Sequence, residues 1–232
     1  MHHRIFFDGD LGQEEVSITG EELHHAARVV RVREGEEVEL LDGRGTAVTG
    51  EVVAASRDAI RVRITGPAPS RESPLRITLA MAIIQLEKFE LVLQKATELG
   101  VAALIPLVTE RVEVRPERYR GKAERWEKIV FEAVKQSGRS VMPSLEQPIA
   151  FEDVVRRPGV KFFFDADSAP GDSPSFQTAT LLIGPEGGWA QAEIELAREE
   201  GCIFQRLGPR RLRAETAAIA AAGIIAARYG DI

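Results

Sequence analysis

Residues 76–232 alternate between short apolar runs and longer amphipathic stretches, and this alternation limits the possible fold more than any other feature. Buried strands are predicted at residues 76–84, 102–109, 161–166, 180–184 and 202–208. Helices are predicted at residues 89–100, 117–139, 190–201 and 214–230, with Pro116 near the start of the second. Such a series is typical of an α/β domain in which a parallel sheet carries helices on both faces.

The first seventy residues follow another pattern. Apolar and polar residues alternate at 36–43, 46–55 and 59–66, which predicts half-buried antiparallel strands. One helix is expected after Thr19, because the sequence Thr-Gly-Glu-Glu at 19–22 matches a capping box. Short strands with a single helix predict a small β-barrel.

A proline-rich stretch, GPAPSRESP at residues 66–74, separates the two patterns. Its prolines, glycine and serines disfavour regular structure. We therefore expect one domain over residues 1–68, a linker at about 66–74 and a second domain over residues 74–232.

The composition indicates which cellular compartment and which partners to expect. The single cysteine, Cys202, cannot form an internal disulfide and suits a reducing compartment. Signal-peptide and membrane-length apolar segments are not evident in the sequence, so we expect a cytoplasmic protein without a membrane partner. Histidine pairs at 2–3 and 24–25 lack the cysteine or carboxylate spacing of a metal site, so no metal is expected.

The net charge of −6 argues against a strongly basic nucleic-acid binder. A polyanionic partner would therefore have to be held by local groups of arginines, although solvated surface charge explains the first group equally well. The two groups are Arg28, Arg31 and Arg33, and Arg206, Arg210, Arg211 and Arg213.

Two predicted strands end in Gly-Pro turns, Gly184-Pro185 and Gly208-Pro209. If their strands are parallel neighbours, both turns lie at one edge of the sheet, where ligands bind in such folds. The first turn lacks the lysine of a phosphate-binding loop and carries Glu186, so a neutral or cationic ligand is favoured. Glu186 could instead interact with the N-terminal end of the next helix.

The stretch LGPRRLRAETAAIAAAGIIAA at residues 207–227 is the second informative segment. Its alanine-rich helix can pack closely on a neighbouring backbone. Glu215 and Thr216 lie at the start of this helix, where they can cap it or meet a ligand. The three arginines at 210, 211 and 213 are difficult to explain by packing alone.

The motifs LLIGPEGGW and LGPRRLRAETA together resemble the SPOUT superfamily of S-adenosylmethionine-dependent methyltransferases. More narrowly, the chain resembles the RsmE family, which methylates uridine N3 in 16S ribosomal RNA. Further matching stretches follow in order: HHRIFF, LHHAARVVRVREGE, QKATELGV at 94–101 and QSGRSVMP at 136–143. The resemblance spans nearly the whole chain.

The resemblance implies a PUA-like, RNA-binding β-barrel followed by a trefoil-knotted α/β domain, in a homodimer. It also implies three loops that hold S-adenosylmethionine. The implied cofactor residues are Thr109, Arg111, Leu182, Ile183, Gly184, Pro185, Glu186, Gly187, Gly188, Leu207, Gly208, Leu212, Arg213, Glu215, Thr216 and Ala217. Departures from the family pattern are small: Lys135, Trp189, Ala190 and Arg211 replace a glutamate, a phenylalanine, a serine-like cap and an apolar residue.

Uridine N3 is a good nucleophile only when deprotonated, so the enzyme must favour the anionic base. We expect Arg213, with Arg210, to stabilise that anion through a uracil carbonyl, and Glu215 to accept a proton or orient a partner. Phosphate contacts are expected from Arg4, Arg28, Arg31 and Arg33, with 16S rRNA in the assembled small ribosomal subunit as the partner. The alternatives are a ribose 2′-O-methyltransferase, a non-catalytic RNA-binding protein and a nucleotide-binding regulator.

Overall fold

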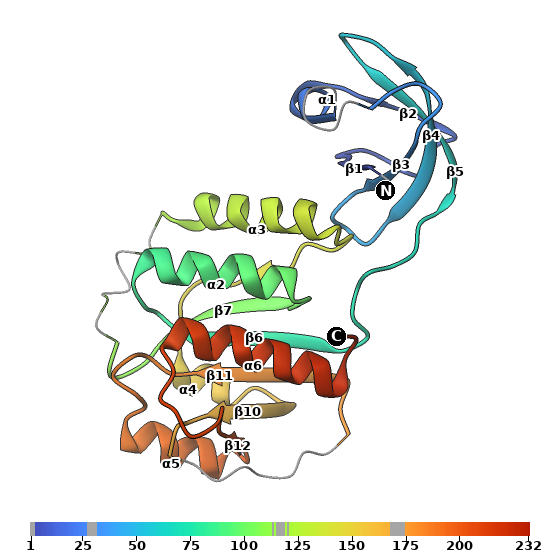
Figure 1. Cartoon of the computed structure of the whole chain (residues 1–232). Helices are drawn as coiled ribbons and strands as arrows, with labels where there is room; N and C mark the ends of the chain where they lie inside the picture. Colours follow the sequence, from blue (N-terminus) through green and yellow to red (C-terminus); the bar gives the residue numbers. More distant parts are fainter. Residues whose placement is uncertain (1–2, 27–31, 113, 115–118, 120, 168–174) are drawn as a thin grey trace. The chain divides into compact units, whose positions relative to one another are not determined.

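The computed structural model describes residues 3–26, 32–112, 114, 119, 121–167 and 175–232 (Figure 1). The chain forms two compact units. The first unit contains Met1–Glu72 and Val134–Met142, and the second contains Ser73–Ala133 and Pro143–Ile232. Residues 134–142 thus group with the first unit, whereas the sequence pattern places them in the second domain. The expected Arg28, Arg31 and Pro116 lie outside the described residues.

The first unit is built on a five-stranded sheet of order β1-β3-β4-β5-β2. Its elements are β1 (His3–Phe6), β2 (Glu15–Ile18), α1 (Gly20–His25), β3 (Glu37–Leu41), β4 (Ala47–Ala55) and β5 (Ile60–Pro67). The pair β1 and β3 is parallel, and the other neighbouring pairs are antiparallel. The three antiparallel strands predicted from alternation are confirmed.

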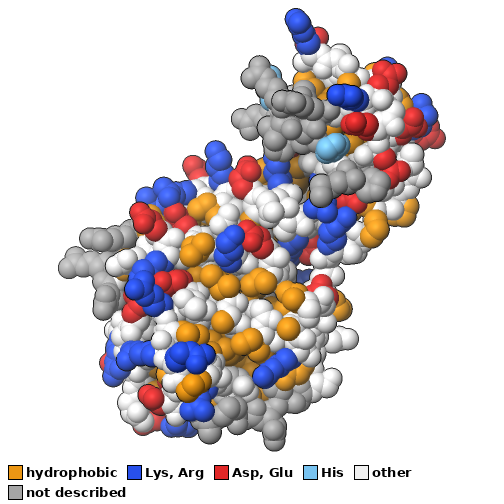
Figure 2. Space-filling model, viewed as in Figure 1, with side chains coloured by type: hydrophobic (Ala, Val, Ile, Leu, Met, Phe, Trp, Pro, Cys, Tyr) orange, Lys and Arg blue, Asp and Glu red, His pale blue; other side chains and the backbone are white. Residues whose placement is uncertain are grey.

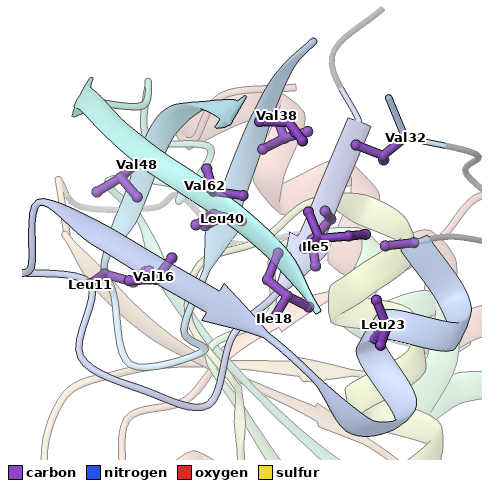
Figure 3. Packing of buried hydrophobic residues seen from close by; sticks show 13 residues of the cluster. Ile5, Leu11, Val16, Ile18, Leu23, Val32, Val38, Leu40, Val48 and Val62 are labelled. Carbon is purple, nitrogen blue, oxygen red and sulfur yellow. The ribbon is translucent and has the colours of Figure 1, made fainter. Parts of the chain in front are cut away.

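Apolar side chains from every strand of this sheet form one core (Figure 3). Ile5, Val38, Leu40 and Val62 are each at most 1% exposed. Their positions follow the alternation of strand residues, which sends every second side chain to the covered face.

The helix α1 begins without the predicted capping box. The Thr19 side chain makes no capping hydrogen bond. The Glu22 carboxylate instead accepts a hydrogen bond from Lys135 Nζ at 2.6 Å. A nearby ammonium group attracts this carboxylate more strongly than a main-chain N–H does, because both charges in the pair are full.

The second unit is an all-parallel sheet of order β12-β10-β11-β6-β7-β8, with β9 also paired to β7. Its strands are β6 (Arg76–Ala82), β7 (Ala103–Val108), β8 (Ser144–Leu145), β9 (Ile149–Ala150), β10 (Val160–Phe164), β11 (Thr178–Ile183) and β12 (Ile203–Gln205). Its helices are α2 (Leu86–Glu98), α3 (Ala123–Ser137), α4 (Phe151–Val155), α5 (Gln191–Glu199) and α6 (Ala214–Tyr229), with the end of α3 in the first unit. The predicted α/β fold with a parallel sheet is confirmed.

Helices cover both faces of this sheet (Figure 1). The Phe163 ring of β10 lies 4.5 Å from that of Trp189, in the cluster that also contains α4 and α5 residues. The preceding Phe162 ring lies 6.4 Å from Tyr229 of α6, on the other face. Adjacent strand residues therefore enter opposite cores, as expected for a sheet buried on both sides.

Some elements differ from the sequence prediction. The long helix α3 begins at Ala123, although its pattern predicts a start at residue 117. Tyr119, which precedes it, packs its ring 5.1 Å from Trp126 and donates its hydroxyl hydrogen bond to the Ile84 carbonyl. The short elements β8, β9 and α4 give no recognisable period.

Candidate cofactor and RNA site

A cavity of about 1230 Å³ opens beyond the carboxyl ends of β10, β11 and β12. The Gly-Pro-Glu-Gly-Gly turn at residues 184–188, called the glycine turn below, forms one wall. Residues 206–213, called the arginine segment, form another. The two Gly-Pro corners are thus brought together, but their strands are not neighbours, because β10 lies between β11 and β12.

Most of the predicted cofactor residues line this cavity. They are Arg111, Ile183, Gly184, Pro185, Glu186, Gly187, Gly188, Leu207, Gly208, Leu212, Arg213 and Ala217. The expected catalytic residue Arg210 lines it as well.

Four predicted residues are placed elsewhere. Leu182 is fully buried in the core on the α4 and α5 face of the sheet. Thr109 lines a separate hollow together with Glu193. Glu215 and Thr216 are not among the cavity-lining residues. Strand alternation explains Leu182, since its neighbour Ile183 takes the orientation toward the cavity.

The glycine turn is shaped by its own residues and by Trp189. The Gly188 N–H donates to the Pro185 carbonyl at 2.9 Å, and Gly188 adopts a φ of +72° that favours glycine. A Cβ on Gly184 would approach the Trp189 indole to 2.8 Å. Trp189 is fixed in turn by its Nε1–H bond of 2.9 Å to the Phe164 carbonyl. Gly184 is therefore needed for this indole, and not only for ligand access.

The Glu186 carboxylate is already paired. Lys88 of α2 donates to its Oε1 at 2.5 Å, and this hydrogen bond raises the pKa of Lys88. The turn itself has no lysine, as the sequence shows, but Lys88 reaches Glu186 from a helix 98 residues away in the sequence. A free negative charge on Glu186 therefore cannot be the feature that selects a cationic ligand.

Arginines dominate the charge of the cavity wall. Six line it: Arg111, Arg198, Arg206, Arg210, Arg211 and Arg213. Two of them hold the glycine turn, since Arg211 donates to the Glu186 carbonyl at 3.2 Å and Arg111 to the Gly187 carbonyl at 3.3 Å. Arg198 lies over the Phe204 ring at 5.3 Å. Together these arginines favour an anionic group in the cavity.

Sequence reasoning missed four lining residues that end or follow β10: Phe164, Asp165, Ala166 and Asp167. Their position directly at the end of an apolar run was the available signal, because strand ends meet at the ligand-binding edge. Lys88 was missed for another reason. Nothing in local sequence spacing relates it to Glu186.

The start of α5 depends on a buried carboxylate. Ala190, the N-cap, has no side-chain acceptor, and Glu193 Oε2 accepts the Ala190 N–H at 2.8 Å. The other oxygen of Glu193 accepts the Glu110 N–H at 2.9 Å. Glu193 is 5% exposed, so it joins the segment after β7 to the helix after the glycine turn. This contact holds the start of α5, where Ala190 replaces the serine-like cap of the family pattern.

In the first unit, two of the predicted phosphate contacts are described. The Glu39 carboxylate accepts hydrogen bonds from Arg71 at 2.8 Å and from Arg4 at 3.3 Å. Arg71 and then Arg4 lower the pKa of Glu39 against the opposing effect of burial. Because one carboxylate meets two guanidinium groups, a net positive charge remains at Arg4. The Arg33 side chain is exposed.

Within the described ranges, no group of three histidine, cysteine, aspartate or glutamate residues could hold a metal ion. No helix in those ranges is both long enough and apolar enough to cross a membrane.

Comparisons with known proteins identify the family of the chain. Residues 71–226 match the RNA methyltransferase domain family, and residues 18–65 match the PUA domain of RNA methyltransferases. Ribosomal RNA small subunit methyltransferase E of Bacillus subtilis is 33% identical over 90% of this chain and 88% of its own. The enzyme of that name from Synechocystis is 32% identical over 87% of this chain and 69% of its own.

Solved structures give the same result. Ribosomal RNA small subunit methyltransferase E from Neisseria gonorrhoeae, bound to S-adenosylmethionine, aligns with a TM-score of 0.86 at 30% identity. A protein from Legionella pneumophila solved in complex with the same cofactor aligns with a TM-score of 0.83 at 36% identity. Each alignment covers 100% of both chains.

Proposed function

Because this chain belongs to the ribosomal RNA small subunit methyltransferase E family, we propose that it methylates uridine N3 in 16S ribosomal RNA with S-adenosylmethionine as methyl donor. One observation carries the proposal. The cavity formed by the glycine turn and the arginine segment lies at the strand ends of a chain that matches the family along most of its length.

The residues present fit S-adenosylmethionine. Residues of the glycine turn line the cavity together with Leu207 and Gly208, and Gly188 and Gly208 both have a positive φ. Bare main chain at such corners can recognise an adenine edge by hydrogen bonds without a basic side chain. We assign these segments, with Leu212 and Ala217, to cofactor binding.

The bound cofactor supplies an electrophilic methyl group, and the protein must present a deprotonated uracil to it. Arg213 and Arg210 line the cavity and are the proposed ligands of a uracil carbonyl oxygen. Their positive charge stabilises the anion that forms when N3 loses its proton, and this lowers the barrier to methyl transfer. They also help to hold the base in line with the methyl carbon.

Of the two roles expected for Glu215, accepting a proton or orienting a partner, we propose the second. Its Oε2 is buried, makes no hydrogen bond within the described part of the chain and does not line the cavity. It contributes an electrostatic interaction to Lys88, as Arg213 does with the opposite sign. We therefore propose that Glu215 orients neighbouring charges and does not accept the N3 proton.

The first unit is the proposed RNA-binding part, acting on rRNA in the assembled small subunit in the cytoplasm. Its match to a PUA domain and the net positive charge left at Arg4 support this assignment. The exposed Arg33 is a second proposed phosphate contact, because base-independent binding depends on such charges.

We further propose a homodimer formed through α2 and α6, and a knotted arrangement of the C-terminal segment. These two helices pack side by side, and apolar side chains gather over them (Figure 2). Leu91 of α2 is 42% exposed, and Ile224 of α6 is 37% exposed. Exposed large apolar side chains on adjoining helices are typical of an interface between subunits.

Labelled methyl transfer tests the function. The purified protein is incubated with S-adenosylmethionine carrying a labelled methyl group and with small ribosomal subunits that lack the modification. Nucleoside analysis of the 16S rRNA is expected to give N3-methyluridine. A label on ribose 2′-oxygen, or no transfer despite cofactor binding, contradicts the proposal. Free 16S rRNA as a parallel substrate is expected to react more slowly.

A further inference from the structure

Three cationic side chains from three separate segments hold the glycine turn. Lys88 of α2 pairs with the Glu186 carboxylate at 2.5 Å. Arg111, which follows β7, and Arg211 of the arginine segment donate to main-chain carbonyls of the turn at 3.3 Å and 3.2 Å. The turn is thus fixed through its side chain and through its backbone.

These three contacts differ in strength. The two arginine hydrogen bonds are exposed and long, and such bonds contribute little because water competes for both partners. The Lys88 and Glu186 side chains are 27% and 31% exposed, and their contact is short. A partly shielded, charge-assisted hydrogen bond is the strongest kind among the three. Lys88 is therefore the main support of the turn.

The position of Lys88 in its own helix is unfavourable without this partner. It is the third residue of α2, in the first helical turn, where the helix dipole favours acidic side chains. The neighbouring Phe89 is 2% exposed, and its ring lies 5.0 Å from Trp126 of α3. The helix start is therefore a packed, fixed base from which Lys88 reaches Glu186.

Lys88 also lies among charges of both cavity walls. Its pKa is raised by the hydrogen bond to Glu186 and by the charge of Glu215, while Arg213 opposes the shift. Glu186 belongs to the glycine turn, and the other two residues stand at the start of α6. An ammonium group in this place stabilises the approach of the turn to the α6 start, because it attracts a carboxylate from each.

We propose that Lys88 is a positioning residue for the cofactor cavity, holding the glycine turn through Glu186 in the shape that receives the methyl donor. The inference rests on the proposed function, and it adds a residue outside the cavity lining. Loss of the ammonium group leaves Glu186 without its cation, so the turn samples other shapes and binds the cofactor less well.

Calorimetric titration of S-adenosylmethionine into purified variants tests this role. Lys88→Met and Glu186→Gln are each expected to raise the Kd on the order of 10-fold. The double variant should be no weaker than the weaker single variant, because both changes remove one shared interaction. Lys88→Arg should recover part of the affinity, which a general packing defect would not allow.

Lys95→Met is the matched control, since Lys95 lies on the same helix and pairs with Glu98 at 3.0 Å. It should bind like the wild type, and thermal unfolding should show that all variants are folded. A Kd for Lys88→Met within about twofold of the wild type, or losses that add in the double variant, overturns the inference. A wild-type protein that does not bind the cofactor overturns the proposed function itself, and the inference with it.

Discussion

Removal of the Arg213 side chain should leave the surrounding fold intact. Its carbonyl accepts the Ala217 N–H at 2.8 Å and so begins α6, while its exposed guanidinium lines the cavity. At this residue the main chain therefore supports the helix start, and the side chain does not. A guanidinium in this setting can respond to charge that develops on a bound base.

Arg213→Ala should lower the single-turnover rate of methyl transfer by about 100-fold or more, because an anion-stabilising donor is lost. The Kd for S-adenosylmethionine should change by less than about threefold. Rapid-quench measurement of labelled rRNA checks the rate, and Arg228→Ala, in the last turn of the same helix, is the control. An unchanged rate would remove Arg213 from the mechanism.

Two carboxylates show which single-residue roles the sequence can predict. Glu22 stands at the correct spacing for a capping box and pairs with Lys135 instead, while Glu186 pairs with Lys88. Local spacing relates a side chain only to its chain neighbours, whereas folding offers it a full opposite charge from a distant segment. The glycines and arginines of the two Gly-Pro corners were accessible to prediction because their positions at strand ends are local properties.

At the level of elements, β1 and β3 are joined by a charged cross-strand pair. Arg4 and Glu39 are partners in their parallel register, and Arg71 completes the group. The pKa of Glu39 is lowered in the folded protein. A carboxylate with a depressed pKa contributes stability above its unfolded pKa, and this contribution is lost as pH falls through the folded value.

Glu39→Gln should therefore lower the unfolding free energy at neutral pH, and it should lower it less at acidic pH. The difference in unfolding free energy between wild type and variant should narrow as pH falls below about 4.5, the ordinary value for this carboxyl. Urea unfolding followed by circular dichroism across this range checks the trend. The exposed Glu34→Gln is the control, and an equal difference at every pH would contradict the assignment.

The start of α5 gives a second prediction for an element. Glu193→Ala removes hydrogen bonds to the main-chain N–H groups of Ala190 and Glu110, at least one of which is buried. The expected loss of unfolding free energy is about 2–3 kcal/mol, since hydrogen bonds to buried charged groups are expensive to leave unmade. Chemical denaturation measures it. Glu195→Ala, exposed on the same helix, should cost less than about 0.5 kcal/mol.

Elements of sufficient length were predictable, and short ones were not. The strands β4, β6 and β11 carry long alternating or apolar runs, which fix their type. The four-residue β1 and β2 and the five-residue α4 are too short to show a recognisable hydrophobic period. Their structure depends on tertiary packing, as with Phe151 of α4, whose ring lies 5.1 Å from Trp189.

At the scale of the whole molecule, the exposed apolar side chains over α2 and α6 need a covering partner. Ile224→Asp places a charge on this surface, and burying it unpaired between subunits would be costly. Sedimentation velocity should therefore show a dimer for the wild type and a monomer for the variant. Lys128→Asp, on the exposed side of α3, should remain dimeric. A dimeric Ile224→Asp protein would place the interface elsewhere.

The α/β class and the resemblance to a methyltransferase family followed from the sequence because both depend on long patterns and dense motifs. Which residues belong to which unit could not be predicted from the sequence. Residues 134–142 belong to the first unit although they lie beyond the proline-rich stretch. Contacts made across many intervening residues, such as Arg139 with Glu72 at 2.8 Å, leave no periodic trace in the sequence.

The ion pair between Arg139 and Glu72 limits where the protein can be truncated. Glu72 also accepts the N–H groups of Ser140 and Val141, at 2.8 Å and 3.1 Å, so a downstream strip of chain completes the N-terminal body. A polypeptide ending at residue 72 would expose the surface that this strip covers. A truncation experiment would then measure the properties of a fragment that has lost part of its native structure. Point substitutions in the full-length protein are therefore the better way to separate RNA binding from catalysis.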